Sequence, residues 1–452
     1  MPRPGLRAFI WSGLAGTKGG LALLVVLTAG SGVFEAVLFQ MMGQLVDWLG
    51  QYTPAQLWQE KGHWLGLMAA LLLISPLWVF LSATVKLQTL QGVLPMRLRW
   101  NFHRLMLGQS MGFYQDEFAG RVSAKVMQTA LAMRDIVMTC TDMVVYVLVY
   151  FLTTGLILVQ FDGWLLLPFA VWLGLFLGLM ALFIPKLGRL AERQADARSL
   201  MTGRITDAYT NIVTVKLFSY SRRESAYAKS AMQEFMVTVH DQMRLVSKLE
   251  TFNHTVNILL IGTTAALGVW LWQQGQVGVG AVAAATAMAL RLNGLSHWMM
   301  WETARLFENI GTVQDGMNTL SRRQTISDRA DAVPLQVRAG EIAFRNVTFD
   351  YGRGRPLLQN LNLTIAPGEK IGLVGRSGAG KSTIVNLLLR FYDVADGEVL
   401  IDGQNIAAVT QESLRAQIGM VTQDTSLLHR SVRDNILYGR PDADDEALFQ
   451  AA

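Results

Sequence analysis

The sequence predicts a multi-domain membrane protein, in which an all-α transmembrane domain of six helices precedes a partial α/β domain. Hydrophobic residues make up 51% of the 452 residues and charged residues only 16%, against about 25% in an average soluble domain. Long uncharged runs end near residue 303, and strand-like alternation begins near residue 341. We therefore expect an N-terminal segment over 1–19, a transmembrane domain over 20–308, a linker over 309–340 and the α/β domain over 341–452.

Several uncharged runs reach the length of about 20 residues that a helix needs to cross a bilayer. Residues 251–290 contain no Asp, Glu, Lys or Arg, which is enough for two spans joined by a polar, glycine-bearing turn. The first run is too long for the apolar region of a signal peptide, so we expect it to be retained. The predicted helices cover 20–47, 64–86, 137–160, 163–185, 252–273 and 279–303.

The positions of Lys and Arg predict the orientation. Segments 1–19, 86–135 and 186–248 hold twenty-one of them, whereas 48–63 holds only Lys61 and the two tight turns hold none. Cytoplasmic loops carry the basic excess, so we expect both termini and both long loops in the cytoplasm. The expected location of the chain is the bacterial inner membrane. This placement explains the net charge of +5 without nucleic acid as a partner. The helical spacing of the two loops predicts amphipathic helices that extend the spans.

A phosphate-binding loop identifies the α/β domain as a P-loop NTPase domain. Residues 342–349, 361–365 and 370–374 have the patterns of strands, and the last leads into GRSGAGKS and a predicted helix over 383–391. This is the P-loop pattern GxxxxGK[ST] in its strand–loop–helix setting. Its glycines let backbone N–H groups turn toward phosphate oxygens. The predicted nucleotide ligands are Gly375, Arg376, Ser377, Gly378, Ala379, Gly380, Lys381, Ser382 and Thr383. Lys381 is expected at the β- and γ-phosphates, and Ser382 at Mg²⁺.

The chain as a whole resembles an ATP-binding cassette (ABC) exporter of the half-transporter type, similar to multidrug and lipid exporters, from about residue 20 to 452. Tyr351 stands where that family stacks an aromatic ring on adenine, and residues 396–403 resemble its strand after the P-loop helix. Gln423 matches the Q-loop glutamine, which the family uses in catalysis and at Mg²⁺. In the membrane half, residues 112–122 and 211–218 resemble the two coupling segments.

The resemblance implies a function as well as a fold. It implies ATP and Mg²⁺ as cofactors, a second half-transporter chain as partner (identical, or a paralogue), and a membrane lipid environment. It also implies ATP-dependent export of a hydrophobic or amphipathic small molecule, lipid or peptide. One alternative is a nucleotide-sensing membrane regulator or channel gate. Another is a membrane-tethered P-loop kinase, against which the spacing of Tyr351 and Gln423 argues.

Two charges at mid-span are candidates for substrate contact. Glu35 lies within the first predicted span and Arg291 within the sixth, where an unpaired charge costs about 3 kcal/mol on insertion scales. One interpretation places both in a water-accessible translocation cavity, paired with each other. The other is a structural ion pair without substrate contact. Asp142, near a cytoplasmic end, is expected to reach toward the membrane surface.

Part of the family's catalytic equipment is not found in the 452 residues. The signature motif LSGGQ, a hydrophobic strand ending in Asp-Glu and a switch histidine after the Q-loop are all missing. The acids at 442–446 follow a proline, which is typical of a solvated helix start. By its family the chain would be an ATPase-coupled translocase. We nevertheless expect a fragment or truncated cassette that does not hydrolyse ATP by itself. Hydrolysis needs a group to position the attacking water and a carboxylate to help hold Mg²⁺, and the nearby acids do not follow a buried strand.

The expected lack of hydrolysis is directly testable. The purified 452-residue chain, with no partner subunit, should release phosphate from ATP at the same background rate as its Lys381→Ala variant. A rate that depends on Lys381 would contradict the expectation.

Overall fold

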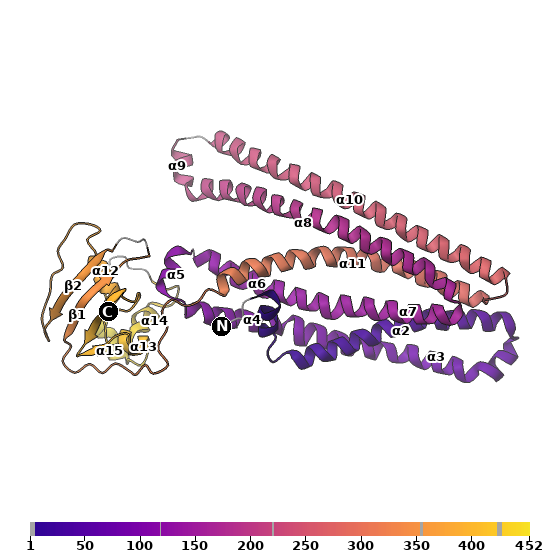
Figure 1. The fold of residues 1–452 in the computed structure, drawn as a ribbon, viewed down its shortest axis with the longest axis horizontal. Helices are drawn as coiled ribbons and strands as arrows, with labels where there is room; N and C mark the ends of the chain where they lie inside the picture. Colours follow the sequence, from indigo (N-terminus) through magenta and orange to yellow (C-terminus); the bar gives the residue numbers. More distant parts are fainter. Residues whose placement is uncertain (1–4, 118, 219–220, 353–355, 423–426) are drawn as a thin grey trace. The chain divides into compact units, whose positions relative to one another are not determined.

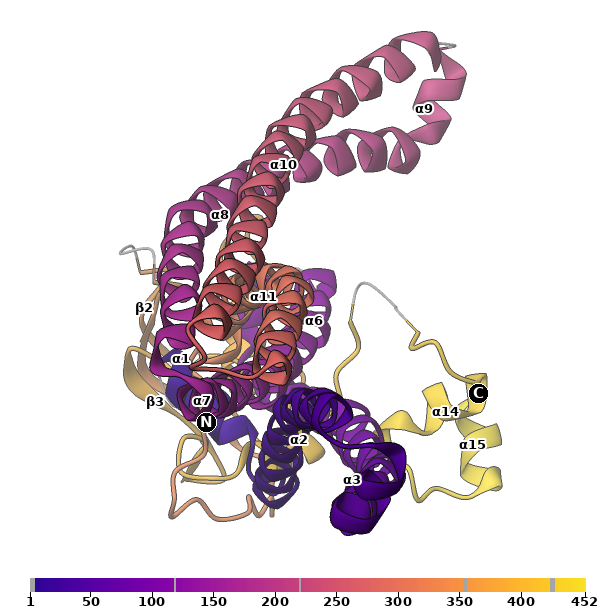
Figure 2. The same cartoon turned by 90° about the vertical axis from the view of Figure 1, so that its right-hand side faces the viewer.

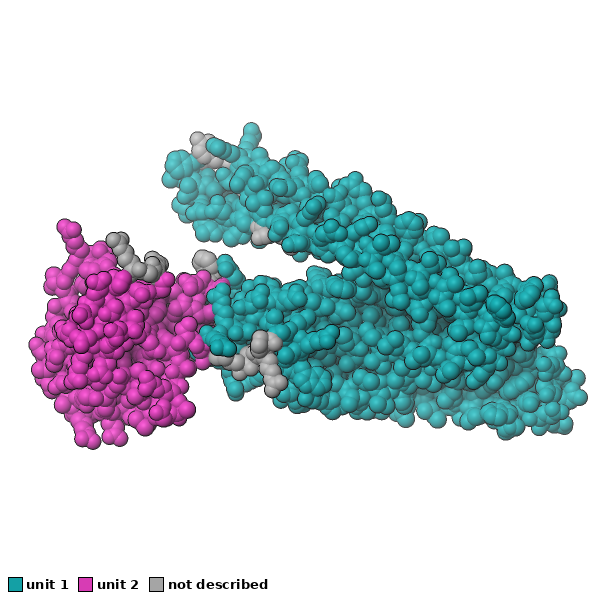
Figure 3. Space-filling view, in the orientation of Figure 1, with its two compact units in different colours: residues 1–108, 118–323 teal, residues 109–117, 324–452 magenta. Residues whose placement is uncertain are grey.

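The computed structural model describes residues 5–117, 119–218, 221–352, 356–422 and 427–452. The chain divides into two compact units (Figure 3). The helical unit comprises residues 1–108 and 118–323, and the sheet unit comprises residues 109–117 and 324–452. A short piece of the first long loop therefore belongs with the C-terminal domain.

The helical unit contains six helices that are long and apolar enough to cross a membrane, counted over the described residues, which confirms the prediction of six spans. They follow one another along the chain and are joined by short turns at one end (Figure 1). A short helix, α1 (Leu6–Gly13), precedes them. The others are α2 (Lys18–Gln51), α3 (Pro54–Ala83) leading into α4 (Val93–Leu107), α6 (Ala119–Met138) leading into α7 (Val145–Phe161), α8 (Leu166–Thr210), α9 (Ile212–Leu217), α10 (Ser221–Gln273) and α11 (Val279–Leu320).

Most of these helices run well past the predicted ends, as the helical spacing of the long loops predicts. Helices α8 and α10 pack along each other and are joined through α9 at their far ends (Figures 1 and 2). Helix α11 continues to Leu320, so the first part of the linker predicted over 309–340 is helical. The helix can continue there because residues 309–320 contain no Pro to end it.

Close backbone approach joins α2 to α11. A Cβ atom built on Gly280 would lie 1.9 Å from the carbonyl oxygen of Gly43, so only glycine fits at this crossing. The carboxylate of Asp47 accepts a hydrogen bond of 2.7 Å from the Gly280 N–H, which satisfies one of the free donors at the start of α11. Small residues at such crossings replace the hydrophobic effect as the source of helix association in lipid.

Buried side chains connect α8, α10 and α11. The ring of Trp172 on α8 is 1% exposed and stacks on Phe176 with 5.1 Å between centroids. Its indole N–H donates to the Asn257 side-chain oxygen at 2.7 Å. The Asn257 amide in turn donates to Asn293 at 3.0 Å and to Ser296 at 2.8 Å. This network satisfies polar groups that lipid cannot solvate.

Over its described residues, the sheet unit has four antiparallel strands in the order β2-β1-β3-β4. They are β1 (Ile342–Phe349), β2 (Leu358–Ile365), β3 (Asp396–Ile401) and β4 (Gln404–Asn405). Its helices are α5 (Met111–Asp116), α12 (Lys381–Leu388), α13 (Gln411–Ala416), α14 (Val432–Ile436) and α15 (Asp445–Ala451). The strands predicted over 342–349 and 361–365 are confirmed. The solvated helix start predicted among the acids is also present, because Asp444 caps α15 through the Ala447 N–H at 2.8 Å.

The prediction of a strand over 370–374 is wrong. These residues are irregular, and Val374 is 98% exposed. An apolar run becomes a strand only when a neighbouring strand takes up its N–H and C=O groups. No strand pairs with it among the residues that the structure describes.

The Gly43–Gly280 crossing predicts that Gly280→Ala destabilises the helical unit by about 1–3 kcal/mol, the usual cost of overpacking. The measurement is the thermal unfolding midpoint in detergent. Gly262→Ala on α10 is the matched control, because a Cβ there meets nothing within 4 Å. Equal midpoints for the two variants would show that the crossing does not limit stability.

Candidate functional site

The P-loop is shaped by two glycines with left-handed backbone conformations. Gly378 has φ +83° and Gly380 has φ +87°, values that side-chain-bearing residues rarely adopt. Helix α12 begins directly after Gly380, with Lys381 as its first residue. The N-terminal N–H groups of α12 and its partial positive charge therefore adjoin the loop.

Lys381 closes the loop on itself. Its ammonium group donates to the carbonyl oxygens of Gly375 at 2.8 Å and Arg376 at 2.9 Å. The predicted ligands Ser377, Gly378, Ala379 and Ser382 lie beside it on the exposed side of the loop. Thr383 is buried, and its hydroxyl group lies 3.1 Å from the hydroxyl group of Tyr351. The structure thus brings the predicted aromatic residue to the P-loop helix.

Tyr351 belongs to an aromatic cluster. Its ring meets Phe349 edge-on at 4.8 Å and Tyr392 at 5.1 Å between centroids. Burial raises the pKa of Tyr392, and the nearby Tyr351 and Asp116 raise it further. Tyr392 was missed by the sequence analysis, although its position just after the P-loop helix was an available signal.

Helix α5 joins this cluster. A Cβ atom on Gly112 would lie 3.5 Å from the ring of Tyr392. The hydroxyl group of Ser110, before α5, accepts a hydrogen bond of 2.7 Å from Thr325. Residues 112–114 of the first coupling-like segment therefore pack within the sheet unit, whereas residues 120–122 belong to α6 of the helical unit.

The P-loop residues fit a nucleoside triphosphate with its magnesium ion. Nothing would meet a Cβ at Gly378 within 4 Å, so the loop leaves room for a large anion. An ammonium group, a helix N-terminus and the hydroxyl group of Ser382 form the donor set that phosphate and Mg²⁺ require. Gln423, the predicted catalytic and metal-binding residue, lies outside the described residues.

Glu35 and Arg291 form an ion pair between α2 and α11. The hydroxyl group of Tyr146 on α7 donates to the Glu35 carboxylate, and Arg291 donates to Tyr146 at 3.4 Å. Each member of the trio comes from a different helix. The pairing that the sequence analysis considered is therefore present in the structure.

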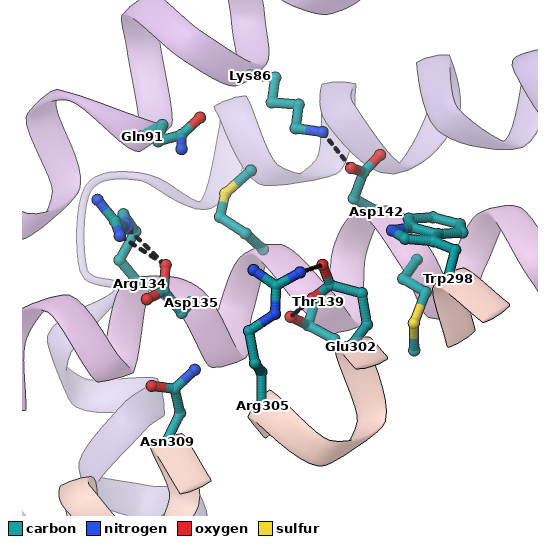
Figure 4. A pocket seen from close by; sticks show the side chains of 12 residues that line it. Lys86, Gln91, Arg134, Asp135, Thr139, Asp142, Trp298, Glu302, Arg305 and Asn309 are labelled. Carbon is teal, nitrogen blue, oxygen red and sulfur yellow. Dashed lines mark hydrogen bonds and ion pairs between the residues drawn. The ribbon is translucent and has the colours of Figure 1, made fainter. Parts of the chain in front are cut away.

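One cavity lies at this trio, and a second, further along α11, adjoins it. The first, of about 420 Å³, is lined by Tyr146, Arg291, Asp142 and Trp298. The second, of about 330 Å³, shares Asp142 and Trp298 with the first (Figure 4). It carries three acids and three bases and is lined by Lys86, Gln91, Arg134, Asp135, Met138, Thr139, Asp142, Met143, Trp298, Glu302, Arg305 and Asn309.

The charges of the second cavity are paired. Asp142 binds Lys86 instead of reaching alone toward the membrane surface, because the two lie on facing π-helical stretches, Thr84–Gln91 and Thr139–Val144. Arg305 binds Glu302 at 2.5 Å. Such π-helical stretches occur frequently at functional sites. The sequence analysis missed the Lys86–Asp142 pair because its members are 56 positions apart in the chain.

Comparison with known proteins gives consistent matches over both units. The model of the ABC transporter transmembrane region matches residues 21–295, and the ABC transporter model matches residues 358–452. An "Uncharacterized ABC transporter ATP-binding protein" of Haemophilus influenzae is 68% identical over 451 residues, which is 100% of this chain and 74% of that protein. "ATP-binding cassette sub-family B member 6" of Xenopus tropicalis is 31% identical over 318 residues, which is 70% of this chain and 36% of that one.

A solved structure described as a bacterial Atm1-family ABC exporter with ATP bound superimposes with a TM-score of 0.78 and 25% identity. The superposition covers 96% of this chain and 75% of that one. The six-span domain followed by a sheet-containing domain is thus an arrangement that an ABC exporter also has.

Proposed function

The chain belongs to the ABC transporter family as an exporter-type half-transporter, and from that premise we propose that it drives the export of an amphipathic substrate with ATP. Its six spans make it a multi-pass membrane protein. The basic loops favour a location in the bacterial inner membrane with both termini in the cytoplasm.

The observation that carries the proposal is one polar face of α11. Arg291, Trp298, Glu302, Arg305 and Asn309 follow one another at spacings of seven, four, three and four residues, so they share a single side of the helix. All five line the two cavities. Three of the five are charged; charges in an otherwise apolar bundle are costly, and they mark substrate pathways.

Of the two substrate classes considered, hydrophobic and amphipathic, the mixture of groups along this face favours an amphipathic substrate. Paired charges recognise a polar or charged group, since a ligand charge can exchange with one member of a pair. Trp298, Met138 and Met143 supply apolar surface in the same cavity. A purely hydrophobic substrate would leave the charges without a ligand. Small molecules, lipids and peptides with a polar group all satisfy these requirements.

The P-loop supplies the nucleotide site. Lys381 would leave the carbonyl oxygens of its own loop for the β- and γ-phosphates, and the ring of Tyr351 would hold the adenine. Ser382 and Gln423 would hold Mg²⁺, which neutralises phosphate charge. ATP shifts a conformational equilibrium only if it binds one state more tightly than the other. The packing of α5 against the aromatic cluster supports a route from this site to the spans, because α5 lies in the chain between α4 and α6.

The proposed partner is a second half-transporter chain, either identical or a paralogue. A nucleotide at this P-loop would complete its site with a signature motif, which the 452 residues do not contain. A paralogous partner is proposed to supply that motif, and a partner of either kind is proposed to close the other side of the translocation path.

Nucleotide binding is predicted to depend on Lys381 and on the Tyr351 ring. Lys381→Ala should weaken binding of a fluorescent ATP analogue by about 10- to 100-fold, because a charge-assisted hydrogen bond is lost. Tyr351→Ala should weaken it up to about tenfold through lost stacking, whereas Tyr351→Phe should preserve it. Tyr438→Ala, at a tyrosine that is 63% exposed, is the matched control. Unchanged binding by the Lys381 variant would refute the nucleotide site.

The transport proposal is tested at the Glu35–Arg291 pair. The assay is ATP-dependent dye uptake into inverted vesicles, with a chain whose cassette carries the missing motifs. Glu35→Gln and Arg291→Gln should each lower both thermal stability and uptake, because each leaves a charge unpaired at membrane depth. The double variant should recover stability but not uptake.

Uptake restored by the double variant would make the pair purely structural. Wild-type vesicles that bind ATP but accumulate no dye would favour a regulator or channel gate instead.

A further inference from the structure

The N-terminal helix α1 is docked onto the helical unit by one side. Phe9 is 1% exposed and stacks on Phe102 of α4 with 5.7 Å between ring centroids. Leu14, just after α1, is also buried. The buried contact between Phe9 and Phe102 therefore fixes the position and orientation of α1 on the helical unit.

The opposite side of α1 is basic and aromatic. Arg7 and Trp11 are four residues apart, so they lie on the same side of the helix. Both are exposed, the Trp11 side chain by 63%. The Lys18 ammonium group lies 4.6 Å from the centroid of the Trp11 ring, within the range of a cation–π interaction.

A third cation comes from α4. The turn between α1 and α2 passes through Gly16 at φ +81°, and a Cβ there would lie 2.5 Å from both terminal nitrogens of Arg97. The absence of a side chain at Gly16 lets the Arg97 guanidinium approach the turn that precedes Lys18. Residues from α1, α2 and α4 thus place three positive charges around one short segment.

No carboxylate neutralises this group within the described residues. Asp and Glu do not occur in residues 1–34 or 61–115. Helices α6 and α11 also adjoin α1, and several of their acids are engaged elsewhere: Asp135 by Arg134, Glu302 by Arg305, and Asp315 by Lys125. The ion pairs of the structure therefore leave Arg7, Lys18 and Arg97 with unbalanced positive charge.

We propose that Arg7, Trp11, Lys18 and Arg97 form a binding site for the phosphate headgroup of an anionic phospholipid. The site stands where the first span begins, so its depth matches the headgroup layer. An exposed indole anchors at this layer, and basic residues beside a span recognise anionic lipids on the cytoplasmic side. This inference depends on the proposed orientation of the chain in the membrane and not on transport. A failed transport assay would therefore not contradict it.

The test is a titration of the full 452-residue chain in dodecyl maltoside with spin-labelled phosphatidylglycerol, followed by electron paramagnetic resonance. The wild type should bind the label, and unlabelled phosphatidylglycerol should displace it far better than phosphatidylcholine. The triple variant Arg7→Gln, Lys18→Gln, Arg97→Gln should bind about a hundredfold more weakly, at about fivefold for each cation. The charge-conserving triple variant Arg7→Lys, Lys18→Arg, Arg97→Lys should bind as the wild type does.

Lys61→Gln is the matched control, because Lys61 also lies over aromatic rings, at 5.8 Å from Trp48 and 5.7 Å from Tyr52, beyond the other end of α2. It should bind the label as the wild type does. Equal binding by the glutamine triple variant would overturn the proposal. Displacement by glycerol 3-phosphate as effective as by phosphatidylglycerol would also overturn it, since the site would then recognise free phosphate rather than lipid.

Discussion

The rule that a charge within a bilayer needs a partner determines the organisation of the helical unit. Glu35 and Arg291 lie on helices that begin and end the bundle in sequence, and they meet because neither can face lipid alone. Tyr146 adds a third helix to the contact. The trio therefore fixes the register of α2, α7 and α11 at the level of the first cavity. Two members of the trio, Tyr146 and Arg291, also line the first cavity.

Packing between the helices extends this constraint in both directions from the trio. Toward one end, glycines at the α2–α11 crossing bring two backbones into contact, and Asp47 binds the start of α11. Toward the other end, ion pairs line the path while π-helical stretches turn Lys86 and Asp142 toward each other. On its α8–α10 side, α11 shares a buried amide network. Helix α11 thus packs against α2, α6 and α10 and joins the two sides of the helical unit.

Features encoded by local patterns could be predicted from the sequence. The six spans follow from hydropathy, β1 and β2 from alternation, and the P-loop from its glycines. The strand expected over 370–374 could not be judged in this way, because a strand exists only through its neighbours and the sequence does not state which neighbours are present. The aromatic contact between Tyr351 and Tyr392 and the Lys86–Asp142 pair were missed for a related reason. Each joins residues more than 40 positions apart, and no periodicity connects them.

Periodicity does explain why the polar face of α11 can serve a path and still be part of a stable bundle. Its five residues recur every three, four or seven positions, so they occupy one narrow side of the helix. The remaining circumference carries buried small and apolar residues such as Ala284, Ala285 and Met288, which pack against neighbouring helices. A polar row spread around the helix would have placed charges against lipid and against the core. Confining it to one side limits the cost of charge burial to the cavities, where opposite charges and water-accessible space reduce that cost.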